Sequence, residues 1–176
     1  MRRWLLLLLL IAGPAQADEA GWRAFLQPGT HAIMRHAEAP GTGDPPGFRL
    51  DDCATQRNLN AAGRAQAARI GAAIRARSVP LTAVLTSQWC RATDTARLLG
   101  LGAPRALPVL TSFFAQPGAE ARATAALKAA LAGRGKSLLV SHQVNITALT
   151  GVFPASGEIV VFSLSPGGAV RVEGRI

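Results

Sequence analysis

The sequence of 176 residues is poor in aromatic side chains and in lysine. It contains no tyrosine, three tryptophans and six phenylalanines, and its only lysines are Lys128 and Lys136. Proteins that bind single-stranded nucleic acid interleave basic side chains with aromatic side chains on which the bases stack. No such basic-aromatic strip is present, so nucleic acid is not an expected partner.

Acidic residues are also scarce. The sequence has 10 acidic and 19 basic residues, which gives a formal net charge of +9. Nearly all of the excess is arginine, whose planar guanidinium matches phosphate oxygens, so the balance favours an anionic ligand such as a phosphoester or a phosphorylated glycolipid. The alternative is that most arginines simply cover solvated helix faces, as Arg64, Arg69, Arg75 and Arg122 would.

Long hydrophobic runs are absent after the first residues. The stretch "WLLLLLLIAG" follows Arg2 and Arg3 and is followed by Ala15 and Ala17 at positions −3 and −1 of a cleavage site. This order is typical of a secretory signal peptide over residues 1–17. A membrane anchor is the alternative, but the run falls short of the ~20 residues that span a bilayer. We expect a periplasmic or secreted domain over residues 18–176, with a net charge of +7 once Arg2 and Arg3 are removed and with no membrane span.

Only two cysteines, Cys53 and Cys90, occur in this exported chain. An even number in an oxidising compartment favours one disulfide. Two buried free thiols are the alternative.

The remaining chain shows neither internal repeats nor a linker, and strand and helix patterns alternate along it. Alternation of this kind predicts a single-domain three-layer α/β/α sandwich with a mostly parallel sheet. The expected elements are helices near 22–26, 61–77, 91–99, 119–132 and 145–150, strands over 30–36, 81–87, 105–110 and 136–142, and a closing hairpin over 157–176. Residues 37–57 have no periodicity, and a loop of this length is typical of a lid or a binding loop.

Several catalytic motifs are missing: a Walker-type glycine loop, a Cys-x5-Arg nucleophile and a cluster of carboxylates for metals. What is present lies where three strands end. The first strand ends at Arg35-His36, the second at Thr86-Ser87 with Arg91 one turn later, and another at Ser141-His142. Carboxyl ends of parallel strands share one edge of a sheet, so we expect these side chains to meet in one pocket.

Such a pocket suits phosphoryl chemistry. Guanidinium groups hold phosphate oxygens, and a neutral imidazole can attack phosphorus between them. Amide groups of the helix that begins near Cys90 are expected to face the same anion. His31, further back on the first strand, is interpreted as structural, and a metal site at His31 and His36 is a poor interpretation without a third ligand.

Four segments resemble the histidine phosphatase superfamily, which has the phosphoglycerate-mutase-like fold. "MRHAE" resembles its Arg-His-Gly signature, and "TQRNLNAAGRAQAARIG" the helix that follows. "LTSQWCRATDTA" resembles its Ser-x-x-x-Arg-Ala-x-x-Thr-Ala segment, and "LLVSHQVNITAL" its second-histidine strand. The resemblance implies that His36 is the phosphorylated nucleophile, that Arg35, Arg91 and His142 hold the phosphoryl group, and that neither metal nor organic cofactor is needed. The signature, the exported chain and the cysteine-bearing loop are together similar to lipopolysaccharide core heptose phosphatases. A Cys53–Cys90 bridge would then tether the long loop beside Arg91.

The sequence departs from the family pattern at two places. Ala37 replaces a glycine, which is tolerable only if its φ is negative. The segment "TSFFAQPG" carries no carboxylate where several relatives have the acidic proton donor. Glu158 is our first choice for the donor, followed by Asp44 and Glu38. Arg57 is a further candidate ligand of the substrate.

These features together predict an exported phosphomonoesterase that forms a phosphohistidine on His36. Two alternatives stay open: a catalytically inactive phosphate-binding module of the same fold, and a phosphohistidine-protein phosphatase. The expected partner is a small phosphorylated molecule, such as a sugar phosphate or an envelope glycolipid phosphate. Neither the physiological substrate nor the oligomeric state follows from the sequence.

Overall fold

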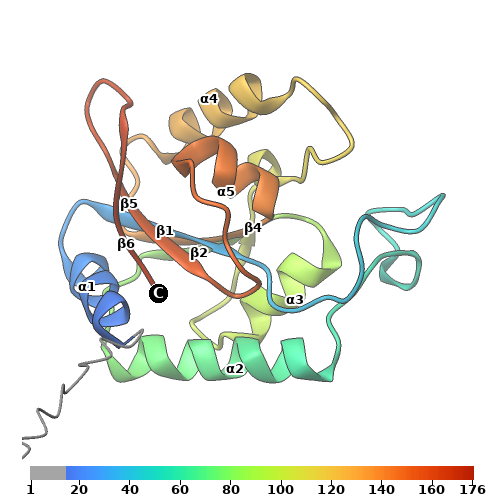
Figure 1. The fold of residues 1–176 in the computed structure, drawn as a ribbon, viewed down its shortest axis with the longest axis horizontal. Coiled ribbons are helices and arrows are strands. Elements are labelled where there is room, and N and C mark those ends of the chain that lie inside the picture. The colour runs from blue at the N-terminus through green and yellow to red at the C-terminus, as the bar shows by residue number, and fades with distance from the viewer. Residues whose placement is uncertain (1–14) are drawn as a thin grey trace, which may run out of the picture.

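The computed structural model describes residues 15–176, which form three layers (Figure 1). The predicted signal peptide lies almost entirely outside the described residues. The helices are α1 (Ala15–Leu26), α2 (Ala61–Ala76), α3 (Cys90–Leu98), α4 (Glu120–Leu131) and α5 (Gln143–Thr150). The strands are β1 (Thr30–Arg35), β2 (Ala83–Thr86), β3 (Arg105–Ala106), β4 (Ser137–Ser141), β5 (Ile159–Leu164) and β6 (Val170–Arg175).

The six strands form one mixed sheet in the order β3-β2-β4-β1-β5-β6. The first four strands of this order run parallel to one another, while β5 and β6 are antiparallel and form the predicted closing hairpin. The predicted fold class is therefore confirmed. The carboxyl ends of β1, β2 and β4, which are neighbours in the middle of the sheet, lie at one edge.

Alternation of side chains along the strands builds two hydrophobic cores. In β1, Ala32 and Met34 pack against α1, α2 and α3, whereas Ile33 packs against α4 and α5. The first three helices and the last two lie on opposite sides of the sheet (Figure 1). Successive strand residues point to opposite faces, so an apolar run of this kind is buried on both. Helices therefore cover both faces of the sheet and leave its edge of strand ends open to a ligand.

Local sequence signals explain the longest helix. The side chain of Asn60 accepts a hydrogen bond from the Gly63 amide and caps the start of α2. Gly71 lets α2 approach α3 closely, because a Cβ at this position would lie 1.9 Å from the Leu99 carbonyl oxygen. A larger residue there would push α2 away from the end of α3, the helix that carries Arg91.

Two elements differ from their predicted extent. The lead helix begins at Ala15 instead of near Trp22, and the strand predicted over 105–110 has only two residues. Pro108 starts a 3-10 turn, η2 (Pro108–Leu110), immediately after that strand. The proline ring fixes φ near −65°, which suits the first residue of a helical turn better than a continued strand. No helix among residues 15–176 combines the length and the hydropathy that a membrane span requires.

Candidate active site

The three predicted strand ends meet at one cavity. The amide of His36 donates to the Ser141 carbonyl (2.9 Å) and that of Ser87 to the Val140 carbonyl (3.0 Å), which fixes the strand ends side by side. A cavity of about 680 Å³ opens above them. Its lining includes five of the six predicted site residues: Arg35, His36, Arg57, Arg91 and His142. The structure brings together residues that are up to 107 positions apart in the chain.

His36 lies at the cavity with its imidazole in a defined tautomer. Its Nδ1 is 2.8 Å from the carbonyl oxygen of Ala37, which can only accept, so Nδ1 carries the hydrogen and the lone pair stays on Nε2. Burial, together with the charges of Arg91, Arg57 and Arg35, lowers the pKa of His36 to about 3 despite the opposing effect of that carbonyl. The imidazole is neutral at physiological pH, which a nucleophile requires.

Ala37 has the negative φ that an alanine requires at this position. Among the described residues, the only non-glycine residue with a positive φ is Ser78, so the alanine is not strained. Its amide donates to Thr95 Oγ1 (3.0 Å), and Thr95 Oγ1 in turn donates to the Arg91 carbonyl (2.7 Å). The backbone next to the nucleophile is thus fixed to α3.

His142 is oriented by Ser87. The serine Oγ lies 2.8 Å from His142 Nε2 and also accepts the amide of Trp89 (3.4 Å). The serine hydroxyl can donate its own hydrogen to Nε2, and in that arrangement the imidazole hydrogen is on Nδ1. Burial, followed by the nearby His36 and arginines, lowers the pKa of His142 well below its ordinary value. A neutral His142 can still donate Nδ1–H to an anion in the cavity.

Three arginines and one aspartate set the charge of the cavity. Arg91 is 3 % exposed, and its Nη1 contacts both carboxylate oxygens of Asp44 (2.8 and 3.1 Å). Arg57 donates to the carbonyls of Gly43 and Ala39, and Arg35 donates to that of Pro154 (3.0 Å). Burial lowers the pKa of all three guanidiniums, yet each stays charged because its ordinary pKa is so high. Positive charge exceeds negative charge among the lining residues.

Spare hydrogen-bond donors gather at this cavity. Within residues 15–176, six buried side-chain nitrogen or oxygen atoms lack a partner, and four of them are N–H groups of lining residues. These are Arg35 Nε, Trp89 Nε1, Arg91 Nε and His142 Nδ1. A buried donor without a partner costs about 1–3 kcal/mol, so such groups are rare unless a ligand satisfies them. Their concentration among the residues of one cavity favours an anion as its ligand.

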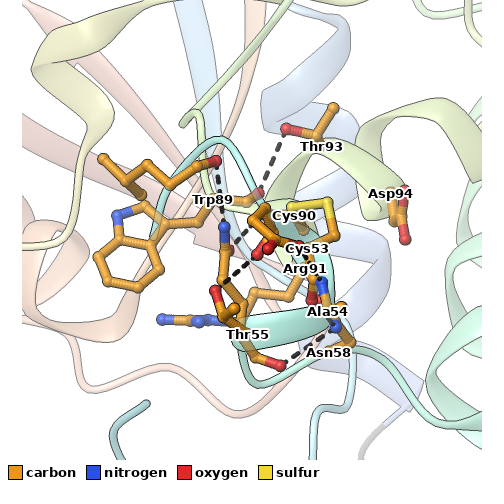
Figure 2. Close-up of a disulfide and its surroundings, with 12 residues drawn as sticks. Cys53, Ala54, Thr55, Asn58, Trp89, Cys90, Arg91, Thr93 and Asp94 are labelled. Atoms are coloured by element: carbon orange, nitrogen blue, oxygen red, sulfur yellow. Dashed lines mark hydrogen bonds between the residues drawn. A yellow bond between two sulfur atoms is a disulfide. The ribbon is translucent and has the colours of Figure 1, made fainter. Parts of the chain in front are cut away.

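The predicted disulfide is present and anchors the long loop. Cys53 and Cys90 are bridged with a Cα–Cα distance of 5.7 Å (Figure 2). Cys53 begins a 3-10 turn, η1 (Cys53–Thr55), and Cys90 is the first residue of α3, directly before Arg91. Gln56 adds a second tie, because its Oε1 accepts the Cys90 amide (2.9 Å). That amide is therefore not available to an anion, contrary to our expectation for the helix start.

The structure does not bring Glu158, our first choice for the proton donor, to the cavity. Its carboxylate receives hydrogen bonds from Arg175 and from the Ala155 amide, and it lines a different hollow beside Trp22 and Arg77. Partial burial raises the pKa of Glu158, but these hydrogen bonds outweigh burial and the pKa lies below its usual value. A proton donor needs the opposite shift. The pattern of strands placed Glu158 near the right edge but could not tell which way its side chain points.

The other two candidate donors, Glu38 and Asp44, differ in whether they lie at the cavity. Glu38 is exposed, and its carboxylate accepts from Asn60 at the start of α2. Asp44 lies in the cavity and is the one carboxylate among its described lining residues. The contact between Asp44 and Arg91 was not predicted from the sequence. The loop has no periodicity, so its sequence does not indicate which side chains point inward. The sequence analysis placed Ser87 only at the end of a strand. Its position in the Ser-x-x-x-Arg segment was the signal that could have indicated a role in the site.

His31 lies at the amino end of β1, away from the cavity. Its Nδ1 accepts the Ser137 amide (3.3 Å), and its ring packs 5.8 Å from that of Phe162. This environment agrees with a structural role.

Comparisons with known proteins agree with this geometry. Residues 32–112 match the family model described as the histidine phosphatase superfamily (branch 1). Among curated proteins the chain has no significant match. The same fold occurs in the protein histidine phosphatase SixA complexed with tungstate, which is 20 % identical with a TM-score of 0.62, over 84 % of this chain and 96 % of that one.

Two further solved structures share the fold. A mycobacterial glucosyl-3-phosphoglycerate phosphatase is 17 % identical with a TM-score of 0.60, over 84 % of this chain and 98 % of that one. A phosphoserine phosphatase from Entamoeba histolytica is 13 % identical with a TM-score of 0.62, over 83 % of this chain and 95 % of that one. The chain therefore has the histidine phosphatase fold, and residues 32–112 carry the sequence pattern of that superfamily.

Proposed function

We propose that the protein is an exported phosphomonoesterase that works through a phosphohistidine on His36. The observation that carries the proposal is the combination of a neutral imidazole with unpartnered buried donors on the residues around it. The fold and the family match of residues 32–112 support it. SixA and the phosphoserine phosphatase are named for phosphatase activity, and this chain shares their architecture.

In the first step, the phosphoryl group binds between the spare N–H groups of Arg35, Arg91 and His142. The lone pair of His36 Nε2 forms a bond to phosphorus while the bond from phosphorus to the leaving oxygen breaks. The guanidiniums neutralise the charge on the three peripheral oxygens. The Ala37 carbonyl holds Nδ1–H and stabilises the positive charge that develops on the ring.

Asp44 is the candidate for the proton that the leaving oxygen needs. Its carboxylate pairs with Arg91, the same guanidinium that the phosphoryl group requires. Binding of a phosphate dianion brings like charges together, so the Asp44 side chain must turn away or take up a proton. A protonated Asp44 beside the leaving oxygen can deliver that proton as the P–O bond breaks.

In the second step, water attacks the phosphohistidine. The P–N bond breaks, the electron pair returns to His36 Nε2, and the proton of the water passes to the Asp44 carboxylate. Inorganic phosphate then leaves, Asp44 releases to solvent the proton that it took from the water, and its carboxylate can return to Arg91. The cycle restores each group and uses only this chain and water.

Trapping the intermediate tests the proposal. We expect turnover of p-nitrophenyl phosphate, together with an acid-labile phosphoryl label on the protein that His36→Ala abolishes. Wild-type turnover no faster than that of His36→Ala, with vanadate still bound, would leave the inactive phosphate-binding module. Hydrolysis of phosphohistidine peptides but of no phosphate ester would favour the phosphohistidine-protein phosphatase, in which the leaving nitrogen makes a weaker demand on an acid.

The role of Asp44 is tested by the choice of leaving group. General acid catalysis contributes about 10²–10⁴-fold, and it matters most for a poor leaving group. We expect Asp44→Asn to slow hydrolysis of an alkyl phosphate at least tenfold more than that of p-nitrophenyl phosphate, whose phenolate leaves unaided. Equal slowing of both substrates would assign Asp44 to holding Arg91 alone.

Export is part of the proposal and rests on the sequence of residues 1–17 and on the disulfide. Amino-terminal sequencing of the protein from its native host is expected to begin at Asp18. The narrower resemblance to lipopolysaccharide core heptose phosphatases makes an envelope glycolipid phosphate one candidate substrate and a sugar phosphate another. A chain that retains Arg2 and Arg3 would contradict the export.

A further inference from the structure

The phenylalanines are divided between two places. Phe25, Phe113 and Phe162 are buried in the protein, at 0, 7 and 0 % exposure. The other three, Phe48, Phe114 and Phe153, are exposed by 37, 60 and 69 %, and all three line the cavity above His36. Exposed phenylalanines scattered over a surface need no explanation, but a set confined to one cavity does.

These rings come from three separate loops, which argues against a chance run of apolar sequence. Phe48 lies in the long loop that follows β1, Phe114 in the loop before α4, and Phe153 in the loop after α5. Phe48 also stacks on Trp89, with ring centroids 4.7 Å apart. We call Phe48, Trp89, Phe114 and Phe153 the aromatic collar. Its three phenylalanines are exposed, whereas His36, Arg91 and His142 are buried, so we call the arginines, the histidines and Asp44 of the lining the floor.

The collar is anchored to the phosphate-binding floor. Trp89 precedes Cys90 of the disulfide, the Arg91 guanidinium lies 4.6 Å over its ring, and His142 packs edge-on against it at 5.7 Å. Figure 2 shows Trp89 beside the bridged cysteines and Arg91. An atom bound to phosphorus at His36 and the carbon atoms beyond it would therefore pass directly from a cationic to an apolar environment.

The remaining lining residues offer little to a hydroxyl-rich leaving group. The charged side chains of the lining are Arg35, Asp44, Arg57 and Arg91, which belong to the floor. Apart from the histidines and the tryptophan, only four uncharged polar side chains, those of Thr42, Ser112, Gln116 and Gln143, belong to the described lining. Two of them are partly engaged, because Gln143 donates to Thr147 Oγ1 (2.9 Å) and Ser112 Oγ accepts the Phe114 amide (3.3 Å). A sugar ring would exchange its hydrogen bonds with water for contacts with phenyl rings.

The size of the cavity fits a ligand larger than phosphate. Its volume of about 680 Å³ lies in the range of about 300–1,000 Å³ that holds whole organic ligands. From these observations we infer that the preferred substrates are phosphomonoesters whose leaving alcohol is an apolar chain or ring. This inference rests on the proposed function and names the substrate class of the same site.

Alkyl phosphonates test the inference without requiring turnover, because their C–P bond is not hydrolysed by a phosphatase. Burial of a methylene stabilises by about 0.8 kcal/mol, so the affinity is expected to rise about two- to fourfold for each added methylene. Calorimetry with the full chain would compare ethyl, butyl and hexyl phosphonate with a hydroxylated phosphonate of similar size. The hexyl compound is expected to bind at least about 15-fold more tightly than the ethyl compound.

Variants locate the effect. In Phe114→Ala/Phe153→Ala the hexyl-to-ethyl ratio is expected to fall at least fivefold. Leu26→Ala is the matched control, because Leu26 is also an exposed large apolar residue (41 %) but lies on α1 outside the cavity. The control is expected to keep the ratio within twofold.

The outcomes separate this inference from the proposed function. A dependence on chain length without hydrolysis of any ester would overturn the phosphatase and retain the apolar ligand. Hydrolysis of esters with no dependence on chain length, or tighter binding of the hydroxylated phosphonate, would overturn the inference and retain the phosphatase. The same comparison made with phenyl phosphonate distinguishes a ring from a chain as the preferred apolar group.

Discussion

The two ends of β1 carry one histidine each, and of these two only His36 lines the cavity. His31 and His36 are 7 and 2 % exposed, and burial lowers the pKa of both. His31 is enclosed by its own strand neighbours, with Nδ1 on the Ser137 amide. His36 uses Nδ1 on the following carbonyl and leaves Nε2 for the cavity. A buried, neutral imidazole is thus common to both, and position at the carboxyl end of the strand distinguishes the one that lines the cavity.

The cations at the two ends differ in the same way. At the amino end, Lys136 Nζ donates to the carbonyls of Phe25 (2.7 Å) and Gln27 (2.6 Å) and is used to join α1 to β4. At the carboxyl end, Arg35 and Arg91 each keep a buried Nε without a partner among the described residues. The Lys136 ammonium uses its N–H groups within the fold and stabilises it. The Arg35 and Arg91 guanidiniums each keep an N–H group that is available to an anion.

Exchanging each histidine for glutamine gives the largest expected difference between the two ends. His36→Gln should lower kcat at least about 10³-fold, because the nucleophile is lost. His31→Gln should keep kcat within about twofold and lower the free energy of unfolding by about 1–3 kcal/mol, because a buried amide loses its acceptor. Steady-state kinetics and urea unfolding of both variants check the pair. Equal loss of activity in the two would show that position on β1 does not decide function.

The disulfide is expected to matter for the carboxyl end and for overall stability. It closes a loop over a separation of 37 residues, for which the chain-entropy model gives about 3–4 kcal/mol. Cys53→Ala/Cys90→Ala should lose stability by about that amount and should raise KM more than it lowers kcat, because the loop that carries Asp44 and Phe48 is released. Thermal unfolding and kinetics measure the two effects. An unchanged KM would mean that Gln56 alone holds the loop.

Acid should destabilise the protein through the carboxyl end in particular. The folded pKa of His36 is depressed to about 3 and the unfolded value is about 6.5, so the unfolded chain binds the extra proton between these values. Its contribution to stability is full above pH 6.5 and is lost as the pH falls toward 3, by about 3 kcal/mol at pH 4. Urea unfolding at pH 7 and pH 4 should show a smaller fall for His36→Gln than for wild type. The same fall in both would contradict a neutral, buried His36.

The smallest expected effect concerns the orientation of His142. Ser87→Ala removes the hydroxyl on His142 Nε2 and frees the ring to adopt the other tautomer. We expect kcat/KM to fall about five- to tenfold, which corresponds to about 1 kcal/mol for one neutral hydrogen bond. Ser87→Thr, which keeps a hydroxyl, is the matched variant and should recover most of the loss. A Ser87→Ala enzyme with wild-type kcat/KM would remove the serine from the site.

The sequence was informative wherever chain direction alone decides position. The apolar runs in the sequence indicated that strands end at His36, Ser87 and His142. Such strand ends must share one edge when the strands are parallel. Asn60 and Pro108 act through local backbone chemistry, so a cap could be predicted, and the early end of β3 has an equally local cause. These features need no knowledge of distant contacts.

The sequence was uninformative wherever a side chain must choose a direction within a loop. Glu158 and Asp44 are both carboxylates in segments near the sheet edge, yet one pairs with Arg175 and the other with Arg91. The partner of each is set by tertiary packing that has no period in the sequence. The aromatic collar was missed for the same reason, because Phe48, Phe114 and Phe153 come from three unrelated loops.

The bridge between Cys53 and Cys90 makes a covalent ring of the chain between them, and this ring contains all of α2 and β2. Arg57 lies inside the ring and Arg91 immediately outside it. A protease that cuts the backbone once anywhere between the two cysteines leaves both fragments attached to each other. Such a nicked molecule would keep the two guanidiniums close together, and its fragments would separate on a gel only after a thiol is added.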